Sequence, residues 1–236
     1  MNKVMAITIR ELSAYFNSAV AYVVVILFLV ITGSLFWLNY FDEVSVLSLR
    51  GYFHQAPLFL AFFAPAITMG AFATERRSGT LELLMTMPVT NLQIVVGKFL
   101  AALILLVVVF VMTLPYPYTL NLLGPLDWGA VWAGYAGLVL LGATYVAIGL
   151  MASSWTRDQV AAVLVAFSIC FFLFLLDQLA GQPTGAVARG LEYASTSHHF
   201  RSIARGVIEV RNVVYYLSLI AVALTVTTLS IGAKRW

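Results

Sequence analysis

Few side chains in this sequence have the types and spacing that catalysis or metal binding requires. His198 and His199 are adjacent, and neighbouring side chains on a helix point about 100° apart, so the pair is poorly placed to chelate one metal ion. Ser153 and Ser154 have no histidine at a comparable depth and lie in no G-x-S-x-G motif. Neither a P-loop pattern nor an H-E-x-x-H pattern occurs. The sequence therefore predicts no catalytic residue, no metal site and no cofactor held by this chain, which we expect not to be an enzyme.

The long apolar runs of the sequence contain almost no residue that could carry a proton or an ion. Asp177 lies at the end of one run, where solvation explains it. The single cysteine, Cys170, lies inside the same run, and we interpret it as a small packing residue rather than a redox group. Ion pumps and proton-coupled carriers usually place charged residues at membrane depth. If the protein transports a solute, we therefore expect the energy to come from another chain.

Polar chemistry is concentrated instead in residues 75–98, which interrupt the apolar runs. Four charged residues lie near the start of this segment: Glu75, Arg76, Arg77 and Glu82. An apolar stripe accompanies them: Leu81, Leu84 and Met85. The segment is too amphipathic for a random connector and too short for a domain. Two interpretations remain open, a solvated connector that touches the membrane surface and a docking helix for a cytoplasmic motor subunit.

Capping signals divide this segment into short helical pieces. Gly79, with the serine before it, is expected to end the preceding helix, and Thr80 can cap a new one. Pro88 stops that helix at or before the residue that precedes it. Thr90 is then expected to cap the next helix, with Gln93 three residues later completing a capping box. The pattern predicts a short amphipathic helix, a turn and a well-capped helix start.

The composition places the chain in a membrane. Hydrophobic residues make up 62% of the sequence and charged residues only 10%, whereas about a quarter of the residues in a soluble domain are charged. Uncharged runs of roughly 17 to 25 residues match the length that a helix needs to cross about 30 Å of hydrocarbon. Six spans are predicted: 19–38, 56–74, 94–120, 130–153, 159–177 and 213–233. Because these runs do not alternate between apolar and polar residues, they exclude a β-barrel and favour helices.

The placement of lysine and arginine predicts the orientation of the chain. An even number of spans puts both termini on the same side of the membrane. That side would carry Lys3, Arg10, Arg76, Arg77, Lys98, Arg157, Lys234 and Arg235. The other side would carry fewer basic residues: Arg50, Arg189, Arg201, Arg205 and Arg211. We therefore expect cytoplasmic termini, and we interpret the basic character as that of inner-leaflet loops rather than of a nucleic-acid-binding protein.

Residues 3–17, before the first span, are typical of a short helix that lies in the plane of the membrane interface. Its apolar residues recur at helical spacing: Met5, Ile9, Leu12 and Phe16. Lys3 and Arg10 share another face, which would point toward the lipid headgroups. The alternative is a simple extension of the first span into the cytosol.

Other residues indicate bends and close helix contacts. Pro65 lies in mid-membrane and should kink the second span. Ala133 with Gly137, and Gly149 with Ser153, are pairs of small residues four apart that suit tight packing.

Two features are expected at the outer side of the membrane. Pro115 and Pro117 should disrupt the outer end of the third span. Residues 186–210 contain an amphipathic stretch, in which Phe200 and Ile203 can share a face, and predict one or two short helices at the outer interface.

One run of residues resembles a known protein family. It is Thr74-Glu75-Arg76-Arg77-Ser78-Gly79-Thr80-Leu81-Glu82-Leu83-Leu84, followed by Pro88-Val89 and Gly97-Lys98. The run is similar to the membrane permeases of ABC-2 type transporters, and within them to the gliding-motility-associated permeases and their relative in nitrous-oxide reductase maturation. A later segment also resembles the gliding-motility type: His199-Phe200, Arg205-Gly206-Val207-Ile208 and Val213-Val214-Tyr215-Tyr216-Leu217-Ser218. The resemblance covers essentially the whole chain.

This resemblance implies one all-α integral membrane domain over residues 1–236, of the ABC-2 or type V exporter-like kind. The domain would have six transmembrane helices, an N-terminal elbow helix, a cytoplasmic coupling helix over about 79–87 and short outer helices before the last span. Two permease copies or paralogues would form the pathway in a bacterial inner membrane. Two separate ATPase subunits, which hold ATP and Mg²⁺, would dock below, and an accessory periplasmic or membrane subunit could join them.

On this basis we expect the chain to couple ATP hydrolysis in a partner to the export or translocation of a substrate that the sequence does not identify. The residues expected to contact the ATPase are Glu75, Arg76, Arg77, Gly79, Thr80, Leu81, Glu82, Leu84 and Met85. The residues expected at the dimer axis or pathway are Pro65, Met69, Phe167, Phe171 and Phe174. The rival hypothesis is a mechanotransmitting or scaffold subunit that acts on a periplasmic partner without moving a solute.

Overall fold

The computed structural model describes residues 3–42, 49–80, 89–180, 190 and 193–233, and it contains no strand among them. The helices are α1 (Lys3–Phe16), α2 (Ala19–Asp42), α3 (Arg50–Thr68), α4 (Gly70–Ser78), α6 (Asn91–Met112), α7 (Pro115–Leu123), α8 (Trp128–Trp155), α9 (Gln159–Ala180), α11 (Thr196–Ala204) and α12 (Val210–Gly232). A chain of this composition must satisfy its backbone hydrogen bonds internally within the membrane, and helices do so.

Six helical stretches of the described chain are long and apolar enough to cross a membrane, which confirms the six predicted spans. They are Ala21–Leu38, Arg50–Ser78, Asn91–Leu123, Trp128–Trp155, Gln159–Leu179 and Val210–Gly232. Several helices extend beyond the predicted limits, as α3 does at Arg50 and α12 at Val210. The reason is that a helix continues through polar residues once it has left the hydrocarbon.

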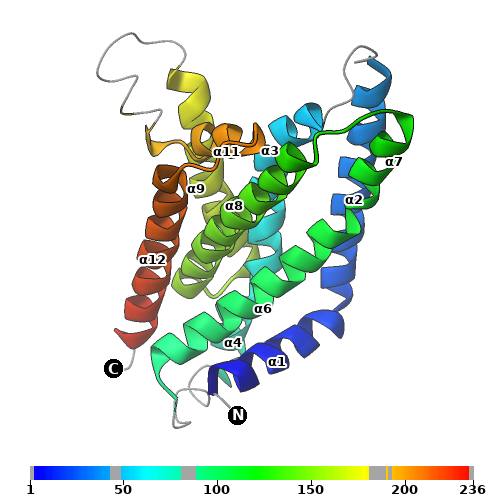
Figure 1. The fold of residues 1–236 in the computed structure, drawn as a ribbon. Helices are drawn as coiled ribbons and strands as arrows, with labels where there is room; N and C mark the ends of the chain where they lie inside the picture. The colour runs from blue at the N-terminus through cyan, green and yellow to red at the C-terminus, as the bar shows by residue number, and fades with distance from the viewer. Residues whose placement is uncertain (1–2, 43–48, 81–88, 181–189, 191–192, 234–236) are drawn as a thin grey trace.

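Helix α8 occupies the centre of the bundle, between α9 and α12 on one side and α6 on the other (Figure 1). Glycines let its neighbours approach its backbone. A Cβ atom at Gly134 would lie 2.4 Å from the ring of Phe53 on α3, and one at Gly142 would lie 2.3 Å from the Leu106 side chain on α6. These distances are far shorter than any real Cβ contact, so the small residues set the helix spacing.

Gly149 brings α8 closest to α3. A Cβ atom there would lie 2.0 Å from Oγ1 of Thr68 and 3.5 Å from Cα of Pro65. The Thr68 hydroxyl donates a hydrogen bond back to the Ala64 carbonyl at 3.0 Å, so its position is fixed by its own helix. The pair of small residues predicted on α8 therefore lies at a tight helix contact.

Ser153, the second member of that pair, bridges the break between α3 and α4. Its hydroxyl oxygen accepts hydrogen bonds from the N–H groups of Phe72 and Ala73, both at 3.1 Å, and donates one to the Met69 carbonyl at 2.8 Å. Pro65, predicted to kink the span, remains inside α3, and the break follows one turn later at Met69. A side chain from α8 thus satisfies backbone groups of the second span.

The third span is interrupted as its prolines predict. Helix α6 ends at Met112, and Pro115 begins α7, where the N–H group that proline lacks would have no helical partner. The Thr113 hydroxyl at this corner lies 3.0 Å from the hydroxyl of Tyr135 on α8. The corner is therefore tied to the central helix.

Helix α1 runs obliquely across the end of the bundle at which α4 and the start of α6 also lie (Figure 1). Ile7 and Thr8 are buried on α6, and a Cβ atom at Gly97 would lie 2.7 Å from the Ile7 side chain. The Thr8 hydroxyl also donates to the Gly97 carbonyl at 3.2 Å. Because α1 ends at Phe16 and packs on α6, it does not simply extend the first span.

The segment before the last span packs more deeply than an interfacial helix would. Within 186–210, part of which lies outside the described residues, Phe200 and Ile203 of α11 are buried. Gly137 of α8 leaves room for them, since a Cβ atom there would lie 2.9 Å from Ile203. Gly206 then takes a left-handed conformation, with φ of +92°, and ends the helical run.

Candidate functional site

The structure describes both ends of residues 75–98, which we call the coupling segment. Four of the predicted ATPase contacts lie outside the described residues: Leu81, Glu82, Leu84 and Met85. Three others are exposed: Arg77, Gly79 and Thr80. Glu75 and Arg76 are only partly exposed. The described part of the segment therefore has an exposed portion, at Arg77, Gly79 and Thr80, and a partly buried portion, at Glu75 and Arg76.

Gly79 ends α4, as the sequence predicts. Its φ of +72° is left-handed, a conformation that glycine adopts without strain, and no atom of the described residues lies within 4 Å of where a Cβ would be. The Ser78 hydroxyl donates to the Thr74 carbonyl at 2.9 Å and lies 2.8 Å from the Thr80 hydroxyl. The end of α4 is thus well defined.

The other end of the segment starts α6 with the predicted capping box. The Thr90 hydroxyl accepts a hydrogen bond from the Gln93 N–H at 3.3 Å, and the Gln93 side-chain oxygen accepts one from the Thr90 N–H at 3.0 Å. These reciprocal bonds satisfy two N–H groups that a helix start leaves open. The start of α6 is therefore fixed by local sequence alone.

A cluster of four charged side chains joins the two ends of the segment to α1. Nζ of Lys98 on α6 lies 2.8 Å from Oε1 of Glu75 on α4 and 3.0 Å from Oε2 of Glu11 on α1. Arg10 of α1 approaches Glu11 at 2.5 Å and Glu75 at 3.6 Å. We call these residues the Lys98 cluster. Because two cations face two carboxylates, the formal charges within it balance.

The surroundings of the Lys98 cluster exclude water from its centre. Only 2% of the Lys98 side chain is exposed, and its ammonium group lies 5.3 Å from the centroid of the Phe72 ring, a cation–π contact. Tyr15 lies half-buried beside it, and burial, followed by the charges of Glu11 and Glu75, raises the pKa of its phenol well above the ordinary value. Tyr15 therefore stays neutral and adds no charge to the cluster.

Charge pairing within the cluster lowers the pKa of the Glu11 carboxyl group. Burial raises the pKa of this carboxyl, but the charge of Lys98 and the hydrogen bonds from Arg10 and Lys98 outweigh burial, so the pKa lies below its ordinary value of 4.5. Oε2 of Glu75, in contrast, is buried without a hydrogen-bond partner among the described residues. The lowered pKa of Glu11 therefore depends on the two cations of the cluster.

The Lys98 cluster is not among the features predicted from the sequence. Glu75 was expected to contact the ATPase, whereas one of its carboxylate oxygens lies against Lys98 in the structure. One signal was available, since Lys98 is a single charge that follows Val95 and Val96 and precedes an apolar run. A lone ionisable residue in such a run usually has a partner inside the protein.

The predicted lipid-facing residues of α1 lie mainly on its open side. Met5, Ile9 and Phe16 are exposed, and Leu12 is partly buried. Arg10 is engaged in the Lys98 cluster rather than pointing only toward headgroups. The helix thus presents one apolar face outward and uses its other faces to hold α6 and α4.

The predicted pathway residues form two groups, one near the end of α3 and the other on α9. Pro65 is buried against α8, and Met69 lies at the break after α3. On α9, Phe167 and Phe171 stack with ring centroids 5.3 Å apart, and Phe171 and Phe174 with centroids 6.1 Å apart. These partly exposed rings form a continuous aromatic row that Pro65 does not join.

No metal site appears among the described residues, where three or more potential ligands never gather. His199 has a structural role. Its Nδ1 lies 2.7 Å from Oδ1 of Asn212, and its Nε2 lies 3.1 Å from the Tyr193 carbonyl oxygen. Its ring also stacks on Tyr215 with centroids 4.1 Å apart. Nδ1 and the ring face therefore join α11 to the last span, whereas Nε2 holds the backbone just before α11.

Comparison with known proteins gives one family. Residues 5–233 match the family model described as ABC-2 family transporter protein. No curated protein sequence matches the chain. The family match covers nearly the whole sequence, including most of α1, the coupling segment and all six candidate spans.

Proposed function

Since the chain belongs to the ABC-2 family of transporter proteins, we propose that it takes up mechanical work from an ATPase partner through the coupling segment and transmits that work to its membrane helices. Members of this family are permease subunits that associate with an ABC ATPase, and the six apolar helices agree with a multi-pass membrane protein. The ATPase partner would hold ATP and Mg²⁺, and this chain would hold neither.

The observation that carries the proposal is the Lys98 cluster. It connects α4, which leads into the coupling segment, with α6, which leads out of it, and with α1. A force applied between α4 and α6 would therefore move three helices together rather than bend a loose connection. Buried ion pairs suit this role because separating their partners is costly in a medium of low dielectric constant.

A second contact would carry the movement toward the centre of the bundle. Ser153 of α8 bonds to backbone groups on both sides of the α3–α4 break. Displacement of α4 would thus pull directly on the central helix. The tight approach of Gly149 to Thr68 leaves little room to absorb that displacement by repacking.

The proposed docking surface consists of the exposed start of the coupling segment and the residues that follow. It comprises Arg77, Gly79, Thr80, Leu81, Glu82, Leu84 and Met85, with Arg76 at its edge. Glu75 is reassigned from docking to holding the helices together, because Lys98 and Arg10 surround it.

The remaining assignments follow the family pattern. We place two ATPase subunits and two permease copies or paralogues in one exporter, in a bacterial inner membrane, with cytoplasmic termini. The aromatic row on α9 supports a contact between the two permeases, since it is partly exposed. A closer relationship to the gliding-motility-associated permeases is supported by the motif around His199 and Gly206, both of which occupy demanding structural positions.

The test uses the chain expressed in its native membrane and purified with the ATPase that accompanies it. Leu84→Asp is expected to abolish stimulation of ATP hydrolysis while leaving membrane insertion intact, because a charge would enter the proposed apolar contact. Leu122→Asp is the matched control, since Leu122 is exposed on α7 at the opposite end of the bundle. Unchanged stimulation in Leu84→Asp would overturn the docking proposal. Stimulation that requires a periplasmic partner and moves no solute would favour the scaffold hypothesis.

A further inference from the structure

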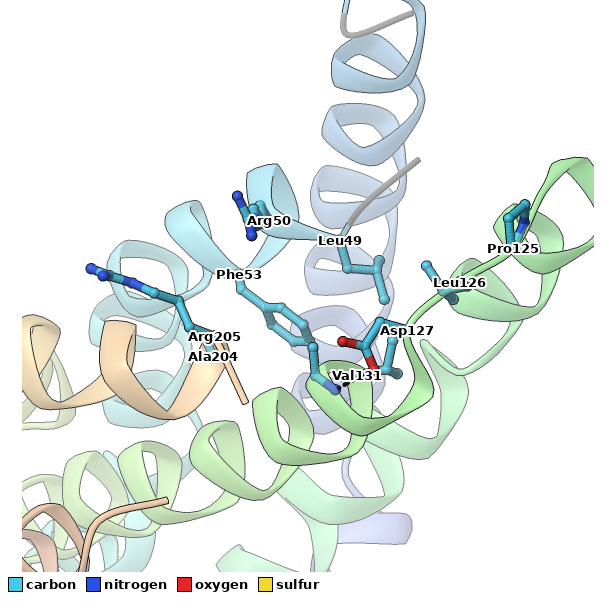
Figure 2. A pocket seen from close by; sticks show the side chains of 10 residues that line it. Leu49, Arg50, Phe53, Pro125, Leu126, Asp127, Val131, Ala204 and Arg205 are labelled. Atoms are coloured by element: carbon cyan, nitrogen blue, oxygen red, sulfur yellow. Dashed lines mark hydrogen bonds between the residues drawn. The ribbon is translucent and has the colours of Figure 1, made fainter. Parts of the chain in front are cut away.

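Two adjoining cavities open beside the start of α3, which lies at the end of the bundle remote from α1 (Figure 1). Figure 2 shows the residues that line the larger cavity. Their volumes are about 280 Å³ and 140 Å³, and both are lined by Arg50, Phe53, Ala204 and Arg205. The α7–α8 connection and the first turn of α8 complete the larger one. We call the two together the α3–α11 pocket.

Two arginines give this pocket a positive charge that the described residues leave unpaired. Arg50 and Arg205 extend from α3 and from the end of α11, on the same side of Phe53 (Figure 2). Neither guanidinium group forms a hydrogen bond or an ion pair with a described residue, whereas the nearby Arg201 pairs with Asp177. The pocket therefore offers two cations with capacity to bind an anion.

The carboxylate in the lining, Asp127, offsets only one of the two positive charges. Oδ1 of Asp127 accepts hydrogen bonds from the N–H groups of Gly129 at 2.9 Å and Ala130 at 3.3 Å. It thereby caps α8 and is stabilised by the positive end of that helix. Asp127 is thus engaged within its own helix start.

Backbone donors add to the positive character. Helix α3 begins at Arg50 without any side-chain cap, and the first bond of this turn runs from the Phe53 N–H to the Leu49 carbonyl at 3.0 Å. The N–H groups of Arg50, Gly51 and Tyr52 have no acceptor within the helix. N–H groups at a helix start favour an anion in front of them.

The floor of the pocket is apolar and rigid. Leu49, Phe53 and Val131 line it and are almost fully buried. The Phe53 ring packs edge-on against Tyr135 and Phe200, with centroids 5.8 Å and 6.3 Å away. A ligand that fills the pocket would therefore combine a negative group with an apolar body.

The pocket also lies at the level of the membrane surface. Trp128 and Trp132 are exposed on the first turns of α8, next to the lining residues Asp127 and Val131. Exposed tryptophans gather at the depth of the lipid headgroups. The anionic amphiphile most available at that depth is a phospholipid.

We propose that the α3–α11 pocket binds the phosphate group of an anionic lipid. Arg50, Arg205 and the first N–H groups of α3 hold the phosphate, and the wall around Phe53 accommodates the apolar part next to it. The site lies away from the coupling segment and needs no ATPase, so its failure would leave the proposed function standing.

The experiment uses the full chain purified in a neutral detergent and a dansyl-labelled phosphatidylglycerol, whose binding is followed by energy transfer from the tryptophans. We expect tighter binding of this lipid than of labelled phosphatidylcholine. Replacing Arg50 and Arg205 by glutamine should weaken the binding by about fivefold for each residue. Arg211→Gln, at an exposed arginine that pairs with Glu209 outside the pocket, is the matched control and should change it by less than about twofold.

Three results would contradict the proposal. If the wild type and the Arg50→Gln/Arg205→Gln variant bind the labelled lipid with equal affinity, the two arginines do not form the site. The same follows if Arg211→Gln loses as much affinity as the pocket variants. Displacement of the labelled lipid by millimolar inorganic phosphate, as readily as by unlabelled phosphatidylglycerol, would show an anion site whose occupant is soluble rather than lipid. Unchanged thermal unfolding of the variants would confirm that they remain folded, as expected for exposed arginines.

Discussion

The ammonium group of Lys98 lies 2.8 Å from a carboxylate oxygen of Glu75. The two residues are the first and last of the coupling segment and lie 23 positions apart in the chain. Glu11 adds a second carboxylate at 3.0 Å from the same ammonium group. Helix α1 and both ends of the segment are therefore held by one buried cation, which makes Lys98 the residue to perturb first.

Lys98→Met should destabilise the protein strongly. It leaves Glu11 and Glu75 as neighbouring carboxylates without their shared cation, and removal of one partner from a buried ion pair costs roughly 3–5 kcal/mol. Thermal unfolding in detergent, followed by fluorescence, measures the loss.

The exposed Arg77 supplies the control for this experiment, since Arg77→Met should change stability by less than about 0.5 kcal/mol. Adding Glu75→Gln to Lys98→Met should recover part of the loss because one orphaned charge is removed. Equal unfolding temperatures for Lys98→Met and Arg77→Met would refute the structural role of the Lys98 cluster.

Ser153→Ala should lower stability by about 1–3 kcal/mol, the cost of leaving buried backbone groups without a partner. The N–H groups of Phe72 and Ala73 lose their acceptor in this variant. Ser154→Ala is the neighbouring control, because the Ser154 hydroxyl donates only to the Met151 carbonyl of its own helix. If both alanine variants unfold at the same temperature, Ser153 does not bridge the two helices.

Gly149→Ala should cost about 1–3 kcal/mol through overpacking, because the new methyl group would meet Oγ1 of Thr68 at 2.0 Å. Gly70→Ala should be neutral or stabilising by up to about 1 kcal/mol, since its Cβ would find its nearest neighbour at 3.6 Å. Combining Gly149→Ala with Thr68→Ala should restore stability by removing the obstructing group. If the double variant unfolds at the same temperature as Gly149→Ala, the contact with Thr68 is not the cause of the destabilisation.

The contribution of Glu11 to the stability of the fold should depend on pH. Its pKa in the folded protein lies below the ordinary value of 4.5, so the ionised carboxylate stabilises the fold above pH 4.5, and this stabilisation is lost as the pH falls through the lowered pKa. Glu11→Gln should therefore be less stable than the wild type by about 1.5–3 kcal/mol at pH 7. The difference in unfolding temperature should narrow below pH 4.5, and a constant difference would show that Glu11 acts without its charge.

Local sequence determined those features whose physical cause lies within a few residues. Long uncharged runs require helices in a membrane, so all six spans could be predicted. Thr90 and Gln93 form their capping box three residues apart. Pro115 begins α7 because a helix start leaves unpaired the N–H group that proline lacks. The end of α4 at Gly79 follows in the same way from the backbone freedom of glycine.

Tertiary structure decided which distant side chains meet. Glu75 and Arg77 are neighbours in sequence and equally polar, yet only the carboxylate of Glu75 turns inward, because α1 and α6 bring Glu11 and Lys98 beside it. Ser153 could be predicted as a small packing residue, but not as the partner of Phe72, since that bond joins residues 81 positions apart. Periodicity identifies the apolar face of a helix and says nothing of which helix will cover it, so the Lys98 cluster and the α3–α11 pocket became visible only in the packed bundle.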